Sequence, residues 1–265
     1  MHPPASLSPL TVTLRGGRLA HAGVLLFDGL DVTLEGGQCT CLLGPSGVGK
    51  TSLLRMLAGL APPGATGAIA CSDGVSLAGR VAYMAQQDLL LPWLSVIDNV
   101  LLGFRLRGIR DPAMRLRAEA LLVEVGLADR ANSRPASLSG GERQRVALAR
   151  TLMEERPVVL MDEPFASLDA ITRHRLQELA ARLLTGRTTL LVTHDPHEAL
   201  RLGHRLLVMA GRPARLTEAP VPPGAPPRDP GEASLLTHHA ALLARLAGVE
   251  DDAHAPPRVA ARAAG

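Results

Sequence analysis

The sequence predicts an α/β fold in which helices cover a mainly parallel β-sheet. Short apolar segments typical of buried parallel strands, at 38–43, 158–161 and 188–192, alternate with segments of helical character. The first segment leads directly into a glycine-rich loop at 44–51, and a helix-forming segment follows and ends near Gly59. A strand, a glycine loop and a helix in this order can place backbone N–H groups around a phosphate.

Further strands are expected on both sides of this unit. Alternating apolar residues at 10–14 predict a short strand, and 23–34 predicts more than one strand, with a turn at 28–29. Residues 80–84 predict another strand, and 206–209 predicts a strand at the edge of the sheet. These strands add to the predicted sheet without changing the fold class.

A helical insertion is expected at about 87–150, where the composition changes. Asp111 precedes Pro112, a residue that favours the first turn of a helix, and the helical pattern continues to about Val125. A later helix is expected at about 142–152. The insertion would therefore interrupt the α/β core.

The chain is expected to divide into one domain at 1–217 and a C-terminal segment at 218–265. Closely spaced prolines at 220–230 predict an extended linker, and 233–246 predicts one helix packed on the domain. Residues 251–265 predict a disordered tail. With no internal repeat in the sequence, we expect one nucleotide-binding unit per chain.

The composition restricts the class of protein. With 46% hydrophobic residues among 265, the chain can bury a substantial core, and its three cysteines favour a reducing compartment over a disulfide framework. The net charge of +3 comes with scattered arginines, so we expect no nucleic-acid partner. The sequence has no evident signal peptide and no apolar run long enough to span a bilayer, so a soluble cytoplasmic protein is expected.

The glycine-rich loop matches the pattern G-x-x-x-x-G-K-[ST] at every fixed position. Lys50 is the only lysine in the chain, and its compact ammonium can reach between two phosphate groups where a guanidinium would not fit. The Thr51 hydroxyl is placed to bind Mg²⁺. We therefore predict a site for a nucleoside triphosphate. Its residues are Gly44, Pro45, Ser46, Gly47, Val48, Gly49, Lys50, Thr51 and Ser52.

Two carboxylates follow the apolar strand at 158–161. In a parallel sheet this end of the strand faces the ligand, so Asp162 would hold Mg²⁺, directly or through water. Glu163 would polarise the water that attacks the γ-phosphate. Two acids after a strand could also form an ordinary solvated turn, but their combination with the glycine loop favours the catalytic interpretation.

The segment 138–144, Leu-Ser-Gly-Gly-Glu-Arg-Gln, predicts a second anion-binding helix N-terminus. Ser139, Gly140 and Gly141 offer a hydroxyl and backbone N–H groups. One chain does not easily bring both helix termini to the same phosphate, whereas a symmetric dimer can pair each glycine loop with its partner's serine-glycine helix. An ordinary serine cap would explain only part of this segment.

These motifs resemble those of the ATP-binding subunit of an ABC transporter. The resemblance implies a P-loop NTPase core, an N-terminal antiparallel β subdomain, an inserted helical subdomain, ATP with Mg²⁺, and a dimer that encloses ATP. Six motifs occur in the family's order over roughly residues 10–215. They are 44–51 (Walker A), Gln86 (glutamine loop), 138–144 (signature), 158–163 (Walker B), 166–169 (D-loop) and 193–195 (switch histidine).

The resemblance also implies roles for single residues. Gln86 would reach Mg²⁺ or the attacking water, His194 would bind the γ-phosphate and orient Glu163, and Asp169 would contact the second copy. The family usually has an aromatic residue near the start that stacks on adenine. Phe27 lies too close to the glycine loop for that role, so the alternatives are one imidazole and two guanidinium groups: His21, Arg15 and Arg18.

The segment 86–93 resembles importer subunits of the nitrate, sulfonate and taurine type and of the type for thiamine precursors. Membrane permease subunits would bind the helical subdomain, with a solute-binding protein involved indirectly, at the cytoplasmic face of the inner or plasma membrane. Trp93 and Phe104 are either contacts to the permease or core aromatics. A small organic nutrient such as hydroxymethylpyrimidine is the expected cargo.

Two other functions fit part of the sequence. An ABC ATPase of DNA repair or translation would usually carry long coiled coils or two nucleotide units, and neither pattern is found in this chain. A P-loop kinase or another NTPase would leave 138–144 and His194 unexplained.

Overall fold

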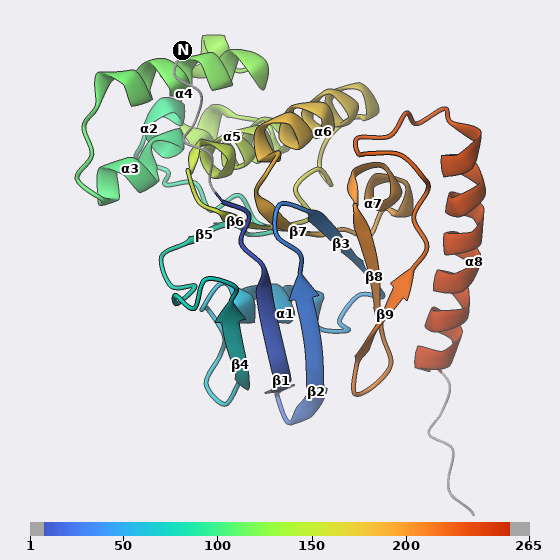
Figure 1. The fold of residues 1–265 in the computed structure, drawn as a ribbon. Coiled ribbons are helices and arrows are strands. Elements are labelled where there is room, and N and C mark those ends of the chain that lie inside the picture. Colours follow the sequence, from blue (N-terminus) through green and yellow to red (C-terminus); the bar gives the residue numbers. More distant parts are fainter. Residues whose placement is uncertain (1–7, 255–265) are drawn as a thin grey trace, which may run out of the picture.

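The computed structural model describes residues 8–254 and has an α/β fold built on two β-sheets (Figure 1). The larger sheet has the order β5-β6-β7-β3-β8-β9; all neighbours are parallel except β9, which is antiparallel to β8. The predicted fold class is confirmed. The strands are β3 (Cys39–Leu43), β5 (Val81–Met84), β6 (Val158–Asp162), β7 (Thr188–Val192), β8 (Arg205–Ala210) and β9 (Arg215–Ala219).

Alternate residues of the buried strands face two separate hydrophobic cores. In β6, Val159 and Met161 belong to the core shared with the helices α5, α6 and α7, whereas Val158 and Leu160 face the core shared with α1 and the smaller sheet. All residues of β6 and β7 are buried, which explains why both strands are mainly apolar and do not alternate with polar residues. The helices are α1 (Lys50–Leu57), α5 (Gly140–Met153), α6 (Ala170–Leu184) and α7 (Pro196–Leu202).

The smaller sheet is antiparallel, with the order β2-β1-β4, and it differs from the sequence prediction in three ways. β1 (Val12–His21) extends well beyond residue 14. β2 (Val24–Leu34) is one strand, because the predicted turn at 28–29 is an irregularity that Gly29 accommodates with a φ of +68°. β4 (Thr66–Cys71) was missed, since most of this edge strand is exposed and shows no apolar alternation.

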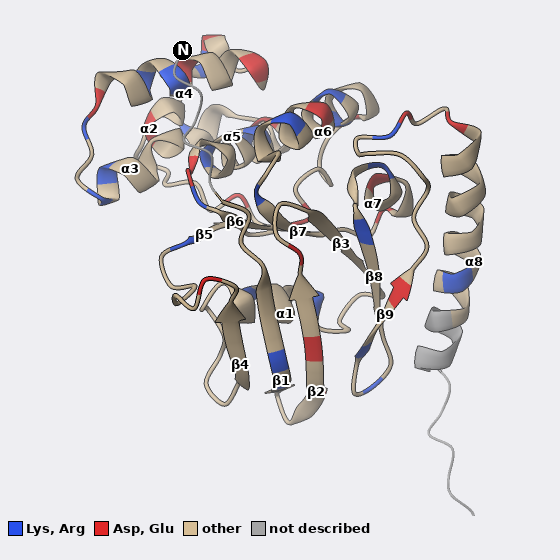
Figure 2. Cartoon of the chain, viewed as in Figure 1, with Lys and Arg blue, Asp and Glu red and all other residues tan. Residues whose placement is uncertain are grey.

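The helical insertion lies at one end of the larger sheet, where Figure 1 shows it in green. Asp111 caps the predicted helix, with its carboxylate accepting the N–H of Ala113 at 2.8 Å. The helices are α2 (Val96–Val100), α3 (Leu102–Leu106) and α4 (Pro112–Glu124), followed by 3₁₀ turns at Ala128–Arg130 and Pro135–Ser137. Basic and acidic residues are interspersed along the ribbon in Figure 2.

The C-terminal part of the chain corrects three predictions. β8 lies inside the sheet, and the edge strand is β9, whose mostly exposed residues carry no buried-strand pattern. The proline-rich segment packs on the body, since buried Arg228 donates to the carbonyl oxygens of Leu200 (2.6 Å) and Gly203 (2.8 Å). α8 (Ala233–His254) is longer than expected, since it extends past residue 246 into the segment predicted as the tail.

The rest of the predicted tail, 255–265, lies outside the described residues. Within 8–254, no helix combines the length and the apolar character needed to cross a bilayer. The proposed division of the chain at residue 217 stays a prediction.

Candidate functional site

The glycine loop between β3 and α1 has a backbone that requires glycine. Gly44, Gly47 and Gly49 have φ values of +150°, +76° and +112°. A Cβ at Gly44 would lie 2.2 Å from the carbonyl oxygen of Met209 in β8, so the loop is packed directly against that strand. Gly49 is the N-cap of α1 and provides no side-chain cap, which leaves the first N–H groups of α1 available to an anion.

Lys50 is the first residue of α1, and its side chain turns back over the loop. The ammonium donates to the carbonyl oxygens of Gly44 (2.6 Å) and Pro45 (2.8 Å), and only 9% of the residue is exposed. Burial lowers its pKa, while the carboxylates of Glu163 and Asp162 act in the opposite direction. Lys50 is therefore held within the residues that the sequence predicts to form the triphosphate site.

Asp162 ends β6 and is 1% exposed, and its Oδ2 has no hydrogen-bond partner. Burial raises its pKa, and a hydrogen bond from Thr51 opposes this rise. An unsatisfied buried carboxylate oxygen beside a hydroxyl suits a hard cation such as Mg²⁺. Within the described part of the chain, no group of three or more His, Cys, Asp or Glu side chains is arranged to hold a metal ion.

Glu163 brings the three predicted catalytic residues together. Its carboxylate accepts a hydrogen bond from Gln86 Nε2 (3.2 Å) and lies 3.3 Å from His194 Nδ1. These side chains follow the ends of three neighbouring strands, β5, β6 and β7. Glu163 has a φ of +50°, which non-glycine residues rarely adopt, and its N–H donates to Val192 O at 2.8 Å.

Gln144 is a site residue whose role the sequence analysis missed. This side chain of α5 is buried, and its amide donates to the backbone carbonyls of Glu163 (3.2 Å) and Pro164 (3.1 Å). Through these two hydrogen bonds, α5 holds the backbone of Glu163 in its unusual conformation. The sequence signal was its place at the end of segment 138–144, but the contact partner could not be predicted from spacing.

Ser139 is the N-cap of α5, which is the alternative that the sequence analysis weighed against an anion-binding role, and the helix begins at Gly140 and Gly141, two residues earlier than expected. Ser139 Oγ accepts the N–H of Glu142 (3.2 Å), and Glu142 Oε2 accepts the N–H of Ser139 (2.7 Å). This reciprocal pair lowers the pKa of Glu142. None of the three predicted binding residues lines the cavity at the glycine loop, so one chain does not join the two helix termini in one pocket.

The cavity at the glycine loop has a volume of about 570 Å³ and contains most of the predicted site residues. His194 lies outside it and lines a small adjoining hollow with Glu163. The predicted residues that line the main cavity are Ser46, Gly47, Gly49, Lys50, Thr51, Ser52, Gln86, Asp162 and Glu163.

One candidate for the adenine contact also lines this cavity. His21 does so with Leu19 and Leu26, whereas Arg15 faces a different cavity and Arg18 lies 3.8 Å from the carboxylate of Asp28. Among the three alternatives from the sequence, the geometry favours the imidazole.

Three aromatic residues discussed from the sequence are now placed. Phe27 is completely buried, with two ring atoms 3.4 and 3.6 Å from the position of a Cβ at Gly49, and therefore packs against the glycine loop. Phe104 is a buried core residue, and Arg107 stacks on its ring. Trp93 is 64% exposed, so only Trp93 of the two predicted permease contacts lies on the surface.

The chain resembles known proteins over this whole arrangement. Residues 27–166 match the family model described as "ABC transporter". The chain is 44% identical to an uncharacterized ABC transporter ATP-binding protein of Haemophilus influenzae, over 87% of this chain and 96% of that protein. It is 40% identical to an aliphatic sulfonates import ATP-binding protein of Burkholderia cenocepacia (97% and 95%) and 46% identical to one of Rhodococcus jostii (81% and 84%).

Solved structures agree with the sequence relatives. A dimeric ATP-binding cassette in a post-hydrolysis state, bound to ADP and Pi, superimposes with a TM-score of 0.70 at 26% identity, over 80% of this chain and 100% of that one. An ATP-binding subunit of an ABC transporter gives a TM-score of 0.69 at 25% identity, over 78% and 89%. This chain therefore belongs to the ABC transporter family, as an ATP-binding subunit with ATPase activity.

Proposed function

We propose that this chain hydrolyses ATP to drive the import of an aliphatic sulfonate through membrane permease subunits. The observation that carries the hydrolytic part is the contact of Gln86 and His194 with the carboxylate of Glu163, beside the cavity that contains Lys50. The cargo is inferred from the relatives of Burkholderia and Rhodococcus, whose names specify aliphatic sulfonates.

In this proposal the triphosphate lies in the glycine loop. Backbone N–H groups at the start of α1 bind phosphate oxygens, and Lys50 moves from the loop carbonyls to the β- and γ-phosphates. Bound Mg²⁺ would neutralise phosphate charge, and the side chains that would hold it are Thr51, Asp162 and Gln86. The unsatisfied oxygen of Asp162 supports this assignment.

Glu163 is the proposed general base. A water placed at its carboxylate would lose a proton to it while the water oxygen attacks the γ-phosphate and the bond to the β-phosphate breaks. His194 would orient the carboxylate and bind the γ-phosphate, and Gln86 would hold the attacking water. The backbone of Glu163, held by Gln144 and Val192, supports this role because a fixed base loses little entropy in the reaction.

The active form is proposed to be a dimer of two copies that closes over ATP. Ser139, Gly140 and Gly141 of one copy would complete the phosphate site of the other, and Asp169 would contact the partner. This model is supported by the absence of these residues from the chain's own glycine-loop cavity and by the dimeric state of the related cassette. The geometry of closure itself stays a proposal.

The chain is further proposed to act as a peripheral subunit at the cytoplasmic face of the membrane. The exposed Trp93, which lies within the predicted helical insertion, is a candidate contact to a permease. A solute-binding protein would deliver the cargo to the permease and would not touch this chain. The earlier expectation of a thiamine precursor stays a prediction, to which the relatives' names add no support.

Transport and cargo are tested by deleting the coding sequence for this chain in its own host. Uptake of labelled ethanesulfonate should fall to background and should return with the wild-type chain but not with Glu163→Gln. If the deletion abolished uptake of hydroxymethylpyrimidine and not of ethanesulfonate, the cargo would be the thiamine precursor and the proposed sulfonate cargo would be wrong. ATPase activity stimulated by nucleic acid, and not by reconstituted permease, would contradict the transport function.

A further inference from the structure

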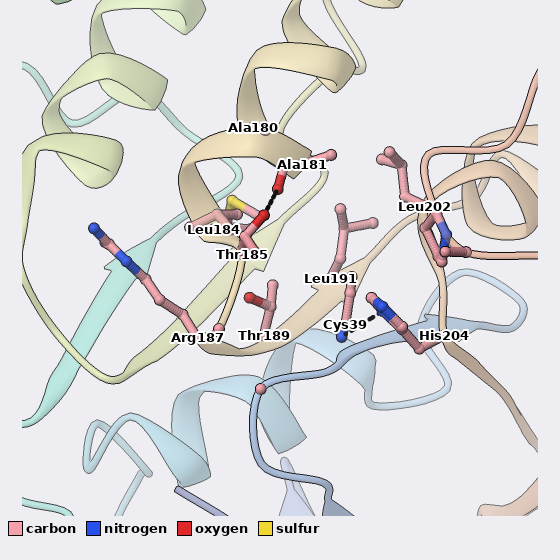
Figure 3. A pocket seen from close by; sticks show the side chains of 15 residues that line it. Cys39, Ala180, Ala181, Leu184, Thr185, Arg187, Thr189, Leu191, Leu202 and His204 are labelled. Carbon is pink, nitrogen blue, oxygen red and sulfur yellow. Dashed lines mark hydrogen bonds between the residues drawn. The ribbon is translucent and has the colours of Figure 1, made fainter. Parts of the chain in front are cut away.

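The helices α6 and α7 are joined by a buried hydrogen bond next to a second cavity. Figure 3 shows this cavity, of about 280 Å³, with Ala181 of α6 and Leu202 of α7 on different sides of it. Gln177 and Glu198 lie one helical turn before these residues, on the same faces of the two helices. Gln177 Nε2 donates to Glu198 Oε2 at 3.0 Å, and the two residues are only 4% and 3% exposed. Glu198 is therefore a carboxyl group held inside the protein.

The neighbours of Glu198 present two hydrogen-bond donors to it. Arg201 can only donate, and its Nη1 lies 2.7 Å from the amide oxygen of Gln177, so the amide NH₂ must face Glu198. The second donor is the hydroxyl of Thr193. Thr193 Oγ1 already accepts the N–H of Asp195 at 3.1 Å, which leaves its own proton for Glu198. An ionised carboxylate can accept both hydrogen bonds, whereas a protonated carboxyl must place its own proton as well.

Thr193 and Asp195 close a turn around His194, the residue proposed to orient Glu163. The buried Thr193 anchors this turn, because its N–H donates to the carbonyl oxygen of Leu42 in β3 at 3.2 Å. The side chain of His194 is 64% exposed, so its position depends on the turn more than on packing around the imidazole. Thr193, His194 and Glu163 line one hollow of about 40 Å³, and Glu198 lines it too.

We propose that Glu198 is a positioning residue for ATP hydrolysis. Its carboxylate holds the hydroxyl of Thr193, the turn that this hydroxyl closes fixes His194, and His194 orients Glu163. Glu198 is not among the residues that line the nucleotide cavity, so it acts through His194 and not on ATP. The inference rests on the proposed roles of His194 and Glu163.

The charge of Glu198 depends on pH near neutrality. Burial raises its pKa to about 7, against the hydrogen bonds from Thr193 and Gln177. Two charged groups also act on it: Asp195 raises the pKa, and Arg173 of α6 lowers it. Since only the ionised form accepts both donors, we expect the positioning effect above pH 7 and its loss below. The other titratable groups near Glu198 are the thiol of Cys41 in β3, whose raised pKa keeps it neutral, and His194 and Glu163 at the shared hollow.

The first test compares Glu198→Gln with the wild type in ATPase assays of the full-length chain. Glutamine keeps the size of the side chain but turns an NH₂ group toward one of the two donors, so one hydrogen bond is lost. At pH 8, kcat should fall about 10-fold, and KM for ATP should stay within about twofold.

The pH profile separates positioning from a general effect on the fold. The ratio of wild-type kcat to variant kcat cancels the ionisations that both enzymes share. This ratio should decrease from about 10 at pH 8 to at most about 2 at pH 6, where Glu198 is mostly protonated in the wild type. A ratio that is the same at both pH values, or a change in KM without a change in kcat, would overturn the proposal.

His194→Ala distinguishes this inference from the proposed function. If Glu198 acts through His194, adding Glu198→Gln to His194→Ala should change kcat by less than about twofold. A further 10-fold loss in the double variant would overturn the proposal. Wild-type kcat in His194→Ala would refute the proposed role of His194 and this inference together. A loss in His194→Ala with wild-type kcat in Glu198→Gln would refute this inference alone.

Two threonines give a matched pair of variants. Thr193→Val removes the hydroxyl that links Glu198 to the turn and should lower kcat about as much as Glu198→Gln, whereas Thr193→Ser should keep the wild-type value. Thr151 of α5 is equally buried, and its hydroxyl donates to the carbonyl oxygen of Ala147 at 3.0 Å, within the same helix. Thr151→Val should therefore leave kcat unchanged. Equal losses in the two valine variants, or wild-type kcat in Thr193→Val, would contradict the proposed link.

Discussion

The two helix N-termini that the sequence assigns to phosphate binding, those of α1 and α5, are built in opposite ways. α1 begins after Gly49, which offers no side-chain cap, and has no acidic residue in its first turn. α5 begins after Ser139, which forms a full capping box with Glu142. The first helix leaves its N–H groups and positive dipole end to a ligand, whereas the second satisfies part of its own terminus.

This difference fits the proposed roles of the two termini. The start of α1 lies in the chain's own cavity with Lys50, so it can bind nucleotide in a single copy. The start of α5 must keep its conformation while the second copy is away, and the capping box provides that stability. The box uses the N–H groups of Ser139 and Glu142, so those of Gly140 and Gly141 remain for the partner's nucleotide.

The largest expected effect tests the chemistry next to α1. Glu163→Gln removes the proposed base but keeps a side chain of the same size, so ATP binding should persist. Hydrolysis should fall about 10²–10⁴-fold, and a closed dimer should accumulate with ATP. Turnover by phosphate release and mass by light scattering measure the two results. Normal turnover would refute the assignment of Glu163 as the base.

The next largest effect concerns the cation of the α1 site. Lys50→Ala should weaken ATP binding about 100-fold, because a buried charge pair with the phosphates is lost. Lys50→Arg keeps the charge and serves as the control; it should not restore binding if the compact shape of the ammonium matters. Titration of a fluorescent ATP analogue gives both affinities. Wild-type affinity in Lys50→Ala would contradict the phosphate role, and wild-type affinity in Lys50→Arg would contradict the shape argument.

The contrast between the two termini also shows what a sequence can predict. The open terminus of α1 and the serine cap of α5 both depend on neighbours within a few residues. The first was predicted from the sequence, and the second was weighed there as an alternative. Arg228 could not be treated in this way, because its partners Leu200 and Gly203 are distant in sequence. Its hydrogen bonds hold on the body a proline-rich segment that was predicted as an extended linker.

The edge strands β4 and β9 were missed for another reason. A strand at the edge of a sheet needs no continuous apolar sequence, and most of the residues in both strands are exposed. Gln144 was recognised as part of a motif, but its hydrogen bond to the backbone of Glu163 joins two elements that only the fold brings together.

A smaller effect should show that the α1 terminus acts in a single copy, whereas the α5 terminus acts only in the dimer. Ser139→Ala should destabilise the chain by about 1 kcal/mol through loss of the cap. It should also weaken ATP-dependent dimerisation about 10-fold while leaving ATP binding to the single copy unchanged. Dimerisation is measured by sedimentation in the Glu163→Gln background. If Ser139→Ala instead weakened ATP binding by one copy as much as Lys50→Ala, the two-copy site would be wrong.

The smallest effect is a pH dependence that α5 should show and α1 should not. The N–H of Ser139 holds the pKa of Glu142 below its ordinary value, so this carboxylate stabilises the fold above about pH 4.5 and loses the effect as pH falls through its lowered pKa. Glu142→Gln keeps a side chain that can complete a capping box but carries no charge. The wild type should exceed it in free energy of unfolding by about 0.3–1 kcal/mol at pH 7, and the difference should shrink below pH 4.5.

Urea unfolding at pH 7 and at pH 3.5 measures this difference, and added salt should reduce it at pH 7, since the charge of Glu142 is partly exposed. α1 has no acidic residue in its first turn and so no counterpart of this effect. A difference that stayed constant with pH would mean that the amide alone supports the cap. The α5 terminus would then owe its stability to hydrogen bonding and not to the helix dipole, and the electrostatic contrast with α1 would rest on Lys50 alone.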